Sequence, residues 1–155
     1  MAVYRLLGLL FFFLPLMAST PVHPELNVDA TDPMISNILA YVNADRAQHG
    51  LSPLKLNDTE SAIAARHSRD MATGKVPFGH TGLDNRAKAI RKALGEVHSV
   101  GENVASGPMT AREVVDGWLN SPGHKRNIEG DFTLTGIGYA KDRQGNIFFT
   151  QIFSK

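Results

Sequence analysis

The order of the periodic patterns along the chain limits its possible folds more than any other feature. In most of the chain before residue 121, apolar residues recur at helical spacing, and most such segments begin with a capping residue. Only 134–140 and 146–153 alternate as β-strands do, around a turn at 142–145. Helices first and an antiparallel hairpin last predict an α+β fold, with helices layered on a sheet. The length of 155 residues fits one such domain.

Four helices are expected. They are bounded by Thr31 or Asp32 and Gly50, by Asn57 and Gly74, by Leu83 and Leu94, and by Thr110 and Asn120. Two of them start with a capping-box pattern, in which Glu60 and Glu113 reach back to the cap residue three positions earlier. Segments 76–82 and 95–107 are predicted to be loops, and 121–124 is expected to break the chain after the last helix.

The first 18 residues have the layout of a secretory signal peptide. Arg5 is the only charge before an apolar run at 6–17, which is shorter than the roughly 20 residues that span a bilayer. The alternative, a buried hydrophobic helix, lacks a polar stripe and caps. Residues 19–30 then form a flexible lead-in, and the folded domain is expected at 31–155. We therefore expect a secreted or extracellular protein (periplasmic in a Gram-negative host) without a membrane span once the signal is removed.

Charge and cysteine content exclude several classes of function. The chain has 16 Lys+Arg against 15 Asp+Glu, and removing Arg5 with the signal leaves no net charge, so no basic face for nucleic acid is expected. The absence of cysteine excludes disulfide scaffolds, cysteine-ligated zinc and thiol nucleophiles. The motifs His-Glu-x-x-His and Gly-x-Ser-x-Gly and the phosphate-binding loop are also absent from the sequence.

Three residues next to glycines are candidates for a functional site: His80, Glu102 and His124. Two neutral imidazoles and a carboxylate can coordinate zinc and leave a position open for water. The same trio without metal can transfer protons. The structural alternative is that the histidines bond loop backbone or cap a helix, and that Glu102 satisfies the donors of its own turn. Spacing alone does not decide between these interpretations.

Other polar or aromatic residues have a simpler explanation. Glu113 belongs to a capping box, and His49 follows a helix whose last carbonyls it can bond. His67 and Trp118 lie on the apolar faces of their helices, so both are predicted to be packed in the core.

Taken in order, the motifs of the chain resemble the CAP superfamily (cysteine-rich secretory proteins, antigen 5 and pathogenesis-related 1, also called SCP domains), in its cysteine-free bacterial branch. The resemblance covers nearly the whole chain after the signal. The segments that carry it are 43–46 (Asn-Ala-Asp-Arg), 51–54 (Leu-Ser-Pro-Leu), 67–71, 78–80 (Phe-Gly-His), 101–105 (Gly-Glu-Asn-Val-Ala), 115–118, 120–128, 132–139 and 150–153.

This resemblance implies an α-β-α sandwich, with a small antiparallel sheet between helical layers, a central cleft and further short strands between 97 and 104. In the family the cleft holds two histidines and two acids. His80, Glu102 and His124 match three of them, and the place of the second acid is taken by Ser121. Glu113, an acid on the same helix, is a doubtful substitute. The resemblance thus implies a divalent metal, Zn²⁺ first, held by His80 and His124.

Two functions follow from the resemblance. The first is a secreted, non-enzymatic module whose His/Glu cleft binds an extracellular ligand, which could be a lipid, a sterol, a glycan or a protein. The alternative is a metal-dependent, protease-like hydrolase that uses the same cleft. No nucleophile stands beside the candidate residues, so the binding module is favoured over an enzyme. A third possibility is an interaction protein in which the cleft residues are structural.

Overall fold

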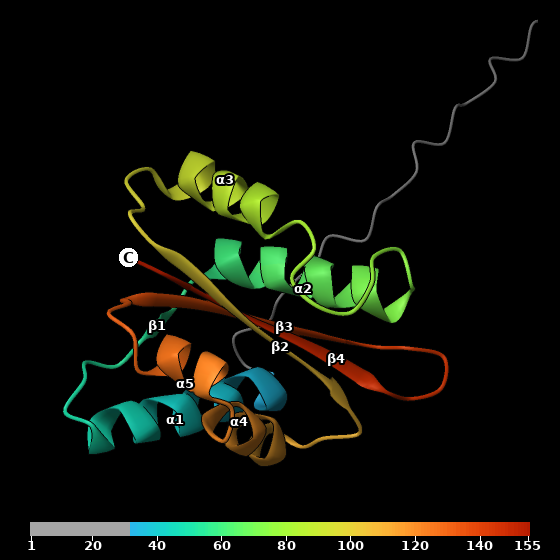
Figure 1. The fold of residues 1–155 in the computed structure, drawn as a ribbon, viewed down its shortest axis with the longest axis horizontal. Coiled ribbons are helices and arrows are strands. Elements are labelled where there is room, and N and C mark those ends of the chain that lie inside the picture. Colours follow the sequence, from blue (N-terminus) through green and yellow to red (C-terminus); the bar gives the residue numbers. More distant parts are fainter. Residues whose placement is uncertain (1–31) are drawn as a thin grey trace, which may run out of the picture.

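The computed structural model describes residues 32–155, which form five helices and four strands (Figure 1). In chain order these elements are α1 (Pro33–Gln48), β1 (Lys55–Leu56), α2 (Asp58–Ala72), α3 (Leu83–Leu94), β2 (Val100–Gly107), α4 (Ala111–Leu119), α5 (Pro122–Ile128), β3 (Leu134–Lys141) and β4 (Ile147–Ser154). The expected signal peptide (1–18) and lead-in (19–30) lie outside the described residues.

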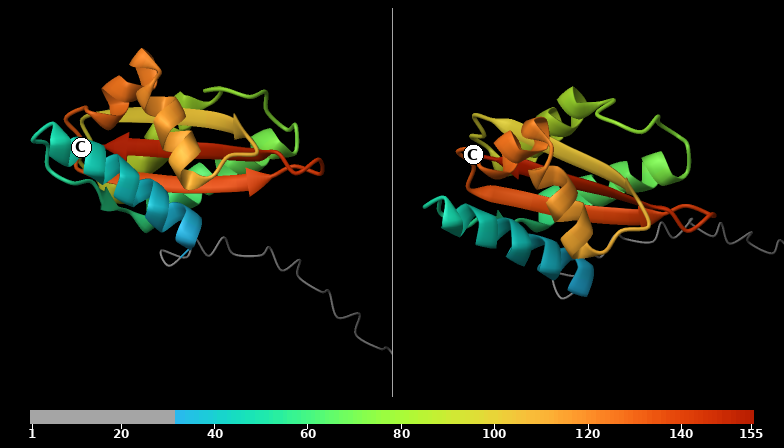
Figure 2. Two further views of the ribbon diagram at one scale, coloured as in Figure 1. Left: turned by 90° about the horizontal axis from the view of Figure 1, so that it is seen from below. Right: turned by 60° about the horizontal axis from the view of Figure 1, so that its bottom comes forward.

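The strands form one sheet in the order β1-β3-β4-β2. The β3–β4 hairpin and the edge strand β2 are antiparallel, whereas the short β1 runs parallel to β3. Helices α2 and α3 lie on one face of the sheet, and α1, α4 and α5 lie on the other (Figures 1 and 2). The α+β sandwich implied by the resemblance is therefore confirmed, with a mixed rather than a purely antiparallel sheet.

The two largest differences from the sequence prediction concern β2 and α5. Residues predicted as a loop at 95–107 contain β2, which is longer than the short strands expected there and pairs with β4 along its whole length. The predicted break at 121–124 is instead the start of α5, with Ser121 as N-cap and Pro122 in the first turn. Proline is tolerated at that position because its missing N–H has no partner in a helix start, so it can begin a helix as well as end one.

The starts of the four predicted helices follow the sequence except at one residue. Asp32 and Asn57 cap α1 and α2 through their side chains, and Thr110 and Glu113 form the complete capping box of α4. Glu60 does not reach back to Asn57, so the second predicted capping box is wrong. Glu60 points into the protein, where its carboxylate accepts a hydrogen bond from Ser154 Oγ on β4.

Helix α2 lies directly on the sheet because β3 has glycines beneath it. A Cβ atom at Gly138 would clash with the backbone of Ala65.

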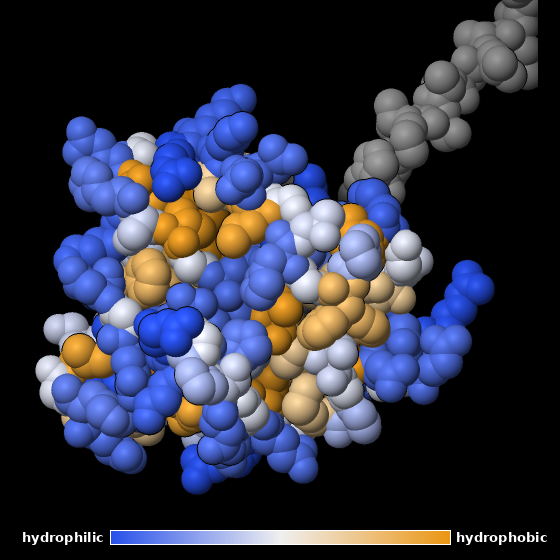
Figure 3. All heavy atoms as spheres, viewed as in Figure 1, coloured by the Kyte–Doolittle hydropathy of each residue, from blue (hydrophilic) through white to orange (hydrophobic). Residues whose placement is uncertain are grey.

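The apolar core is on both sides of the sheet. Trp118 is 1% exposed in the cluster shared with α1 and α4, and Ile152 packs with Ile90 of α3 on the other side. The prediction that Trp118 belongs to the core is confirmed. On the face seen in Figure 3, hydrophobic side chains form separate patches among hydrophilic ones.

The buried Glu60 makes stability depend on pH. Burial raises the pKa of the Glu60 carboxyl above its ordinary value, against the opposing hydrogen bond from Ser154. The unfolded chain therefore loses this proton at lower pH than the folded chain does, so folding free energy is lost as pH rises from the ordinary value to the raised one. We expect Glu60→Gln to stabilise the domain at pH 7 by on the order of 1 kcal/mol, because it removes a buried charge.

Urea unfolding at pH 7 and near pH 4 measures this effect. The gain of Glu60→Gln should shrink toward zero at the lower pH, where the wild-type carboxyl is already protonated. Glu96→Gln, at an exposed position, is the matched control. A Glu60→Gln variant that is less stable than the wild type at pH 7 would contradict the assignment.

Candidate functional site

Glu102 is the buried centre of the candidate site. It lies on the edge strand β2 opposite Ile152, and cross-strand partners share one face of a sheet. That face is the one covered by α2 and α3, because Ile152 packs there with Ala64 and Ile90. The side chain of Glu102 is 0% exposed, so its charge requires a partner inside the protein.

Arg86 of α3 is that partner. Its Nε lies 2.6 Å from Glu102 Oε2 and its Nη2 lies 2.7 Å from Glu102 Oε1, a two-pronged contact that matches the carboxylate. Its Nη1 donates to the carbonyl of Thr81 at 2.9 Å, which ties the His80 loop to the same group. Sequence reasoning missed Arg86. The available signal was that a buried acid needs a base, and Arg86 is the first one after His80.

His80 contacts the same carboxylate from the loop between α2 and α3. Its Nδ1 lies 2.9 Å from Glu102 Oε1, and its side chain is 47% exposed. Because a carboxylate only accepts, Nδ1 carries the proton and the lone pair of a neutral His80 is on Nε2. His80 therefore bonds a side chain rather than the loop backbone.

His67 holds the loop that carries His80. It is 4% exposed, as expected for a core residue, and its Nε2 lies 2.8 Å from the carbonyl oxygen of Gly79. Burial lowers the pKa of His67, so its neutral form is favoured in this position. A residue expected only to pack thus also fixes the position of His80.

His124 comes to the same region from the opposite face of the sheet. It lies on α5, and its backbone carbonyl accepts a hydrogen bond from Asn103 Nδ2 at 3.1 Å. Asn127 of α5 in turn donates to Asn103 Oδ1 at 2.8 Å and to the carbonyl of Glu102 at 3.1 Å. Burial and then the charge of His80 lower the pKa of the His124 imidazole.

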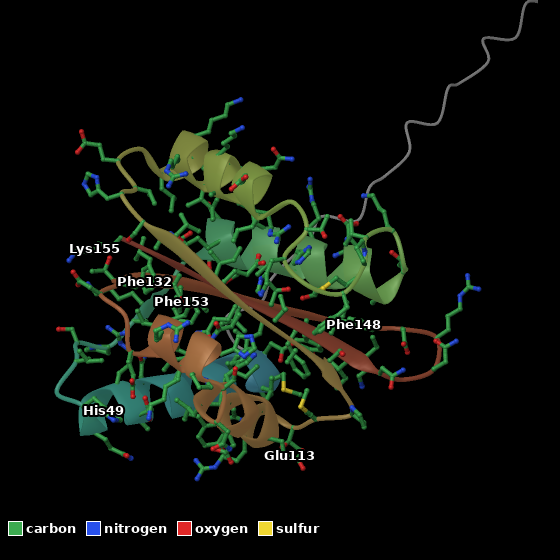
Figure 4. All side chains as sticks on the ribbon, in the orientation of Figure 1. His49, Glu113, Phe132, Phe148, Phe153 and Lys155 are labelled. Carbon is green, nitrogen blue, oxygen red and sulfur yellow. The ribbon has the colours of Figure 1, made fainter. Side chains whose placement is uncertain are left out.

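Glu113, the other acid considered for the site, lies away from His80 and Glu102. Glu113 is exposed at the start of α4, and its Oε2 accepts from the N–H and the hydroxyl of Thr110, both at 2.8 Å (Figure 4). Ser121, at the place of the family's second acid, is the N-cap of α5. The structure therefore brings His80 and Glu102 into contact with His124 nearby, and does not bring Glu113 to them.

Of the side chains that meet at Glu102 in the described residues, only His80 has a free atom that can bind a metal. Both oxygens of Glu102 are engaged by Arg86, so the carboxylate is not a free ligand. Within residues 32–155 the Nε2 of His80 has no hydrogen-bond partner, and a carboxylate behind the other ring nitrogen is the usual partner of a metal-binding histidine. Glu102 is therefore not available as a ligand, and the atom of this contact that is left to bind one is the Nε2 of His80.

The comparison with known proteins identifies the family. Residues 39–153 match the CAP family, described as the cysteine-rich secretory protein family. Because this match spans most of the chain, the chain belongs to the CAP family.

Two proteins of Bacillus subtilis are similar in sequence to this chain. The uncharacterized protein YkwD of Bacillus subtilis (strain 168) is 36% identical over 76% of this chain. The chain spans only 46% of YkwD, and only 33% of a second relative from that strain, the uncharacterized membrane protein YlbC, which is 32% identical over 76% of this chain.

Two solved structures share the fold. An outer surface protein from Borrelia burgdorferi has a TM-score of 0.68 and 23% identity, and the match covers 82% of this chain and 96% of that one. An extracellular protein containing a SCP domain from Bacillus anthracis has a TM-score of 0.63 and 28% identity, covering 76% and 39%. Within residues 32–155, no helix is both long and apolar enough to cross a membrane.

Proposed function

We propose that this CAP domain is a non-enzymatic binding module that acts outside the cell, and that His80 and His124 hold a divalent metal, with Zn²⁺ as the first candidate. One observation carries the proposal: Arg86 and His80 occupy Glu102, so the exposed group that can still accept a metal is the Nε2 of His80. Burial and the charge of His80 lower the pKa of the second imidazole, His124, which favours its neutral, ligand-competent form. Neutral imidazoles are the preferred nitrogen ligands of Zn²⁺.

The same observation argues against hydrolysis. A metal-dependent hydrolase needs a base or a nucleophile beside the bound water. Glu102 is neutralised by Arg86, and the Glu113 carboxylate is engaged by Thr110. The remaining role is to bind. Phe78, two residues before His80 and 54% exposed, supplies apolar surface for a lipid, sterol or protein partner.

Secretion is part of this proposal. The layout of residues 1–18 supports it, and so does the description of the Bacillus anthracis relative as extracellular. The relative YlbC is described as a membrane protein, so attachment at the outer side of a membrane through another segment is the alternative.

Calorimetric titration of the metal-stripped protein with Zn²⁺ tests the site. We expect His80→Ala and His124→Ala each to weaken binding at this site by at least about tenfold, because each removes one of two protein ligands. Lowering the pH below about 6 should release the metal by protonating the imidazoles.

His98→Ala is the matched control, because His98 is an exposed histidine outside the cluster and the variant should bind as the wild type does. Unchanged affinity in both His80→Ala and His124→Ala would contradict the metal site. Hydrolysis of a casein substrate by the Zn²⁺-loaded protein, lost in both variants, would favour the hydrolase instead.

A further inference from the structure

A second group of metal-ligating side chains lies at the C-terminal ends of two helices. Asp45 is in the last turn of α1, His49 is the C-cap of α1 and Glu129 is the C-cap of α5. Each offers one ligand atom, and these atoms all lie within 4.8 Å of one another. Figure 4 shows His49 at the end of α1. His80 and Glu102 lie on other elements, and His124, although it is on α5, is not a member of this group. The inference does not rest on the function proposed above.

The hydrogen bonds within this group are incomplete. His49 Nδ1 lies 2.9 Å from the carbonyl oxygen of Asp45, which only accepts, so Nδ1 carries a proton. In the neutral ring Nε2 is then an acceptor, yet it faces another acceptor, Glu129 Oε1, at 3.2 Å. In addition, Asp45 Oδ2 and Glu129 Oε1 are buried atoms without a hydrogen-bond partner in the described part of the chain. Buried, unpaired carboxylate oxygens are costly.

A second proton on His49 would give a hydrogen-bond donor to only one of the two buried carboxylate oxygens. An imidazolium would satisfy Glu129 Oε1, which also has Lys125 Nζ at 3.5 Å. It would leave Asp45 Oδ2 without a donor, because that oxygen lies 3.7 Å from His49 Nδ1, which already bonds the carbonyl. A cation between the three side chains would satisfy both oxygens and Nε2 together.

The surroundings also favour a cation. The C-terminal end of a helix carries a partial negative charge, and here α1 and α5 both end at the group. Two carboxylates face it, and Lys125 offsets their charge only in part. The His49 side chain is 44% exposed, so solvent and ions reach the group, and Glu129 also lines a pocket of about 390 Å³.

We propose that Asp45, His49 and Glu129 form a second divalent-metal site, with Zn²⁺ or a similar transition metal held by His49 Nε2 and one oxygen of each carboxylate. The 3.2 Å between Nε2 and Glu129 Oε1 suits a common metal, because two ligands at tetrahedral Zn²⁺ lie about 3.3 Å apart. Water completes the coordination. The Asp45 carbonyl behind Nδ1 holds the ring in its binding orientation.

A metal here connects α1 to α5. Arg46 already links the same helices, since its Nη1 donates to the carbonyl of Ile128 at 2.7 Å. Because the site forms only when both helix ends are folded, Zn²⁺ should bind the native state in preference to the unfolded one and raise the melting temperature.

The experiment uses the full chain carrying His80→Ala and His124→Ala, so that the first proposed site cannot contribute. We expect this double variant to bind one Zn²⁺ by calorimetry and to melt at a higher temperature with Zn²⁺ than with a chelator. Adding His49→Ala or Glu129→Gln should weaken the binding by at least about tenfold and abolish the thermal shift. Adding His98→Ala instead should change neither.

The outcomes separate the two proposals. A double variant that binds no Zn²⁺ overturns this second site and leaves the first one standing, whereas equal binding by wild type and double variant overturns the first. Unchanged affinity with Glu129→Gln and with His49→Ala also overturns the second site. Glu129→Gln keeps the shape of the side chain, so it decides the question if His49→Ala does not fold.

Discussion

Replacing Arg86 with Ala is expected to destabilise the domain by about 3–5 kcal/mol. The substitution removes both donors of the two-pronged contact and leaves the carboxylate of Glu102, which is 0% exposed, with His80 as its remaining partner. A single buried charge without its ion-pair partner is far more costly than the pair is favourable. Urea unfolding at pH 7 gives the difference in unfolding free energy.

The partner variants show whether the charge causes the loss. Glu102→Gln in the Arg86→Ala background should recover a large part of the stability, because it removes the buried negative charge and keeps the shape of the side chain. Arg91→Ala, an exposed arginine of the same helix, is the matched control and should cost little. If Arg86→Ala costs less than about 1 kcal/mol, or if Glu102→Gln gives no recovery, Glu102 is not held by this ion pair.

This ion pair also shows what the sequence could not predict. The segment that contains Glu102 has glycines at both ends and reads as a loop, and it becomes a strand only because β4 offers a complete row of partners. The choice of Arg86 depends on α3 lying against that strand, which no local pattern encodes. Tertiary contacts therefore decided both the element and the role of its buried acid.

Where the signals are local, the sequence was sufficient. The helix Leu83–Leu94 has the predicted bounds, and the hairpin around 142–145 follows from alternation and turn residues. Asn57 caps α2 as expected. Glu60 shows the limit of such rules: its position three residues after a cap suits a capping box, but the close approach of α2 to β3 turns its side chain toward Ser154.

In the candidate site too, local motifs predicted some residues, and tertiary contacts determine the others. The Gly-flanked motifs identified His80, Glu102 and His124, and the structure places the first two in hydrogen-bond contact. The residues that position them come from elsewhere in the chain: His67 holds the His80 loop, and Asn127 ties α5 to β2. A positioning residue can be any polar side chain that reaches a backbone carbonyl, so its identity carries no recognisable motif.

Trp118→Ala is the second substitution with a large expected effect, a loss of about 3–5 kcal/mol. Trp118 is 1% exposed on α4, between the sheet and α1, and its Nε1 donates to the carbonyl of Val104 at 3.2 Å. Alanine would leave a cavity where the indole packs and would remove the donor of that hydrogen bond. Thermal or urea unfolding measures the loss.

Trp118→Phe separates the two contributions. Phenylalanine refills most of the volume but cannot donate to Val104, so this variant should lose less than Trp118→Ala while still costing roughly 1 kcal/mol or more for the unpaired buried carbonyl. Strand β2 carries both Val104 and Glu102. If Trp118→Phe loses only packing, its Zn²⁺ binding at His80 should therefore be unchanged. If the substitution displaces β2, its Zn²⁺ binding should weaken. A cost of Trp118→Ala below about 1 kcal/mol would mean that α4 is not anchored to the sheet through this side chain.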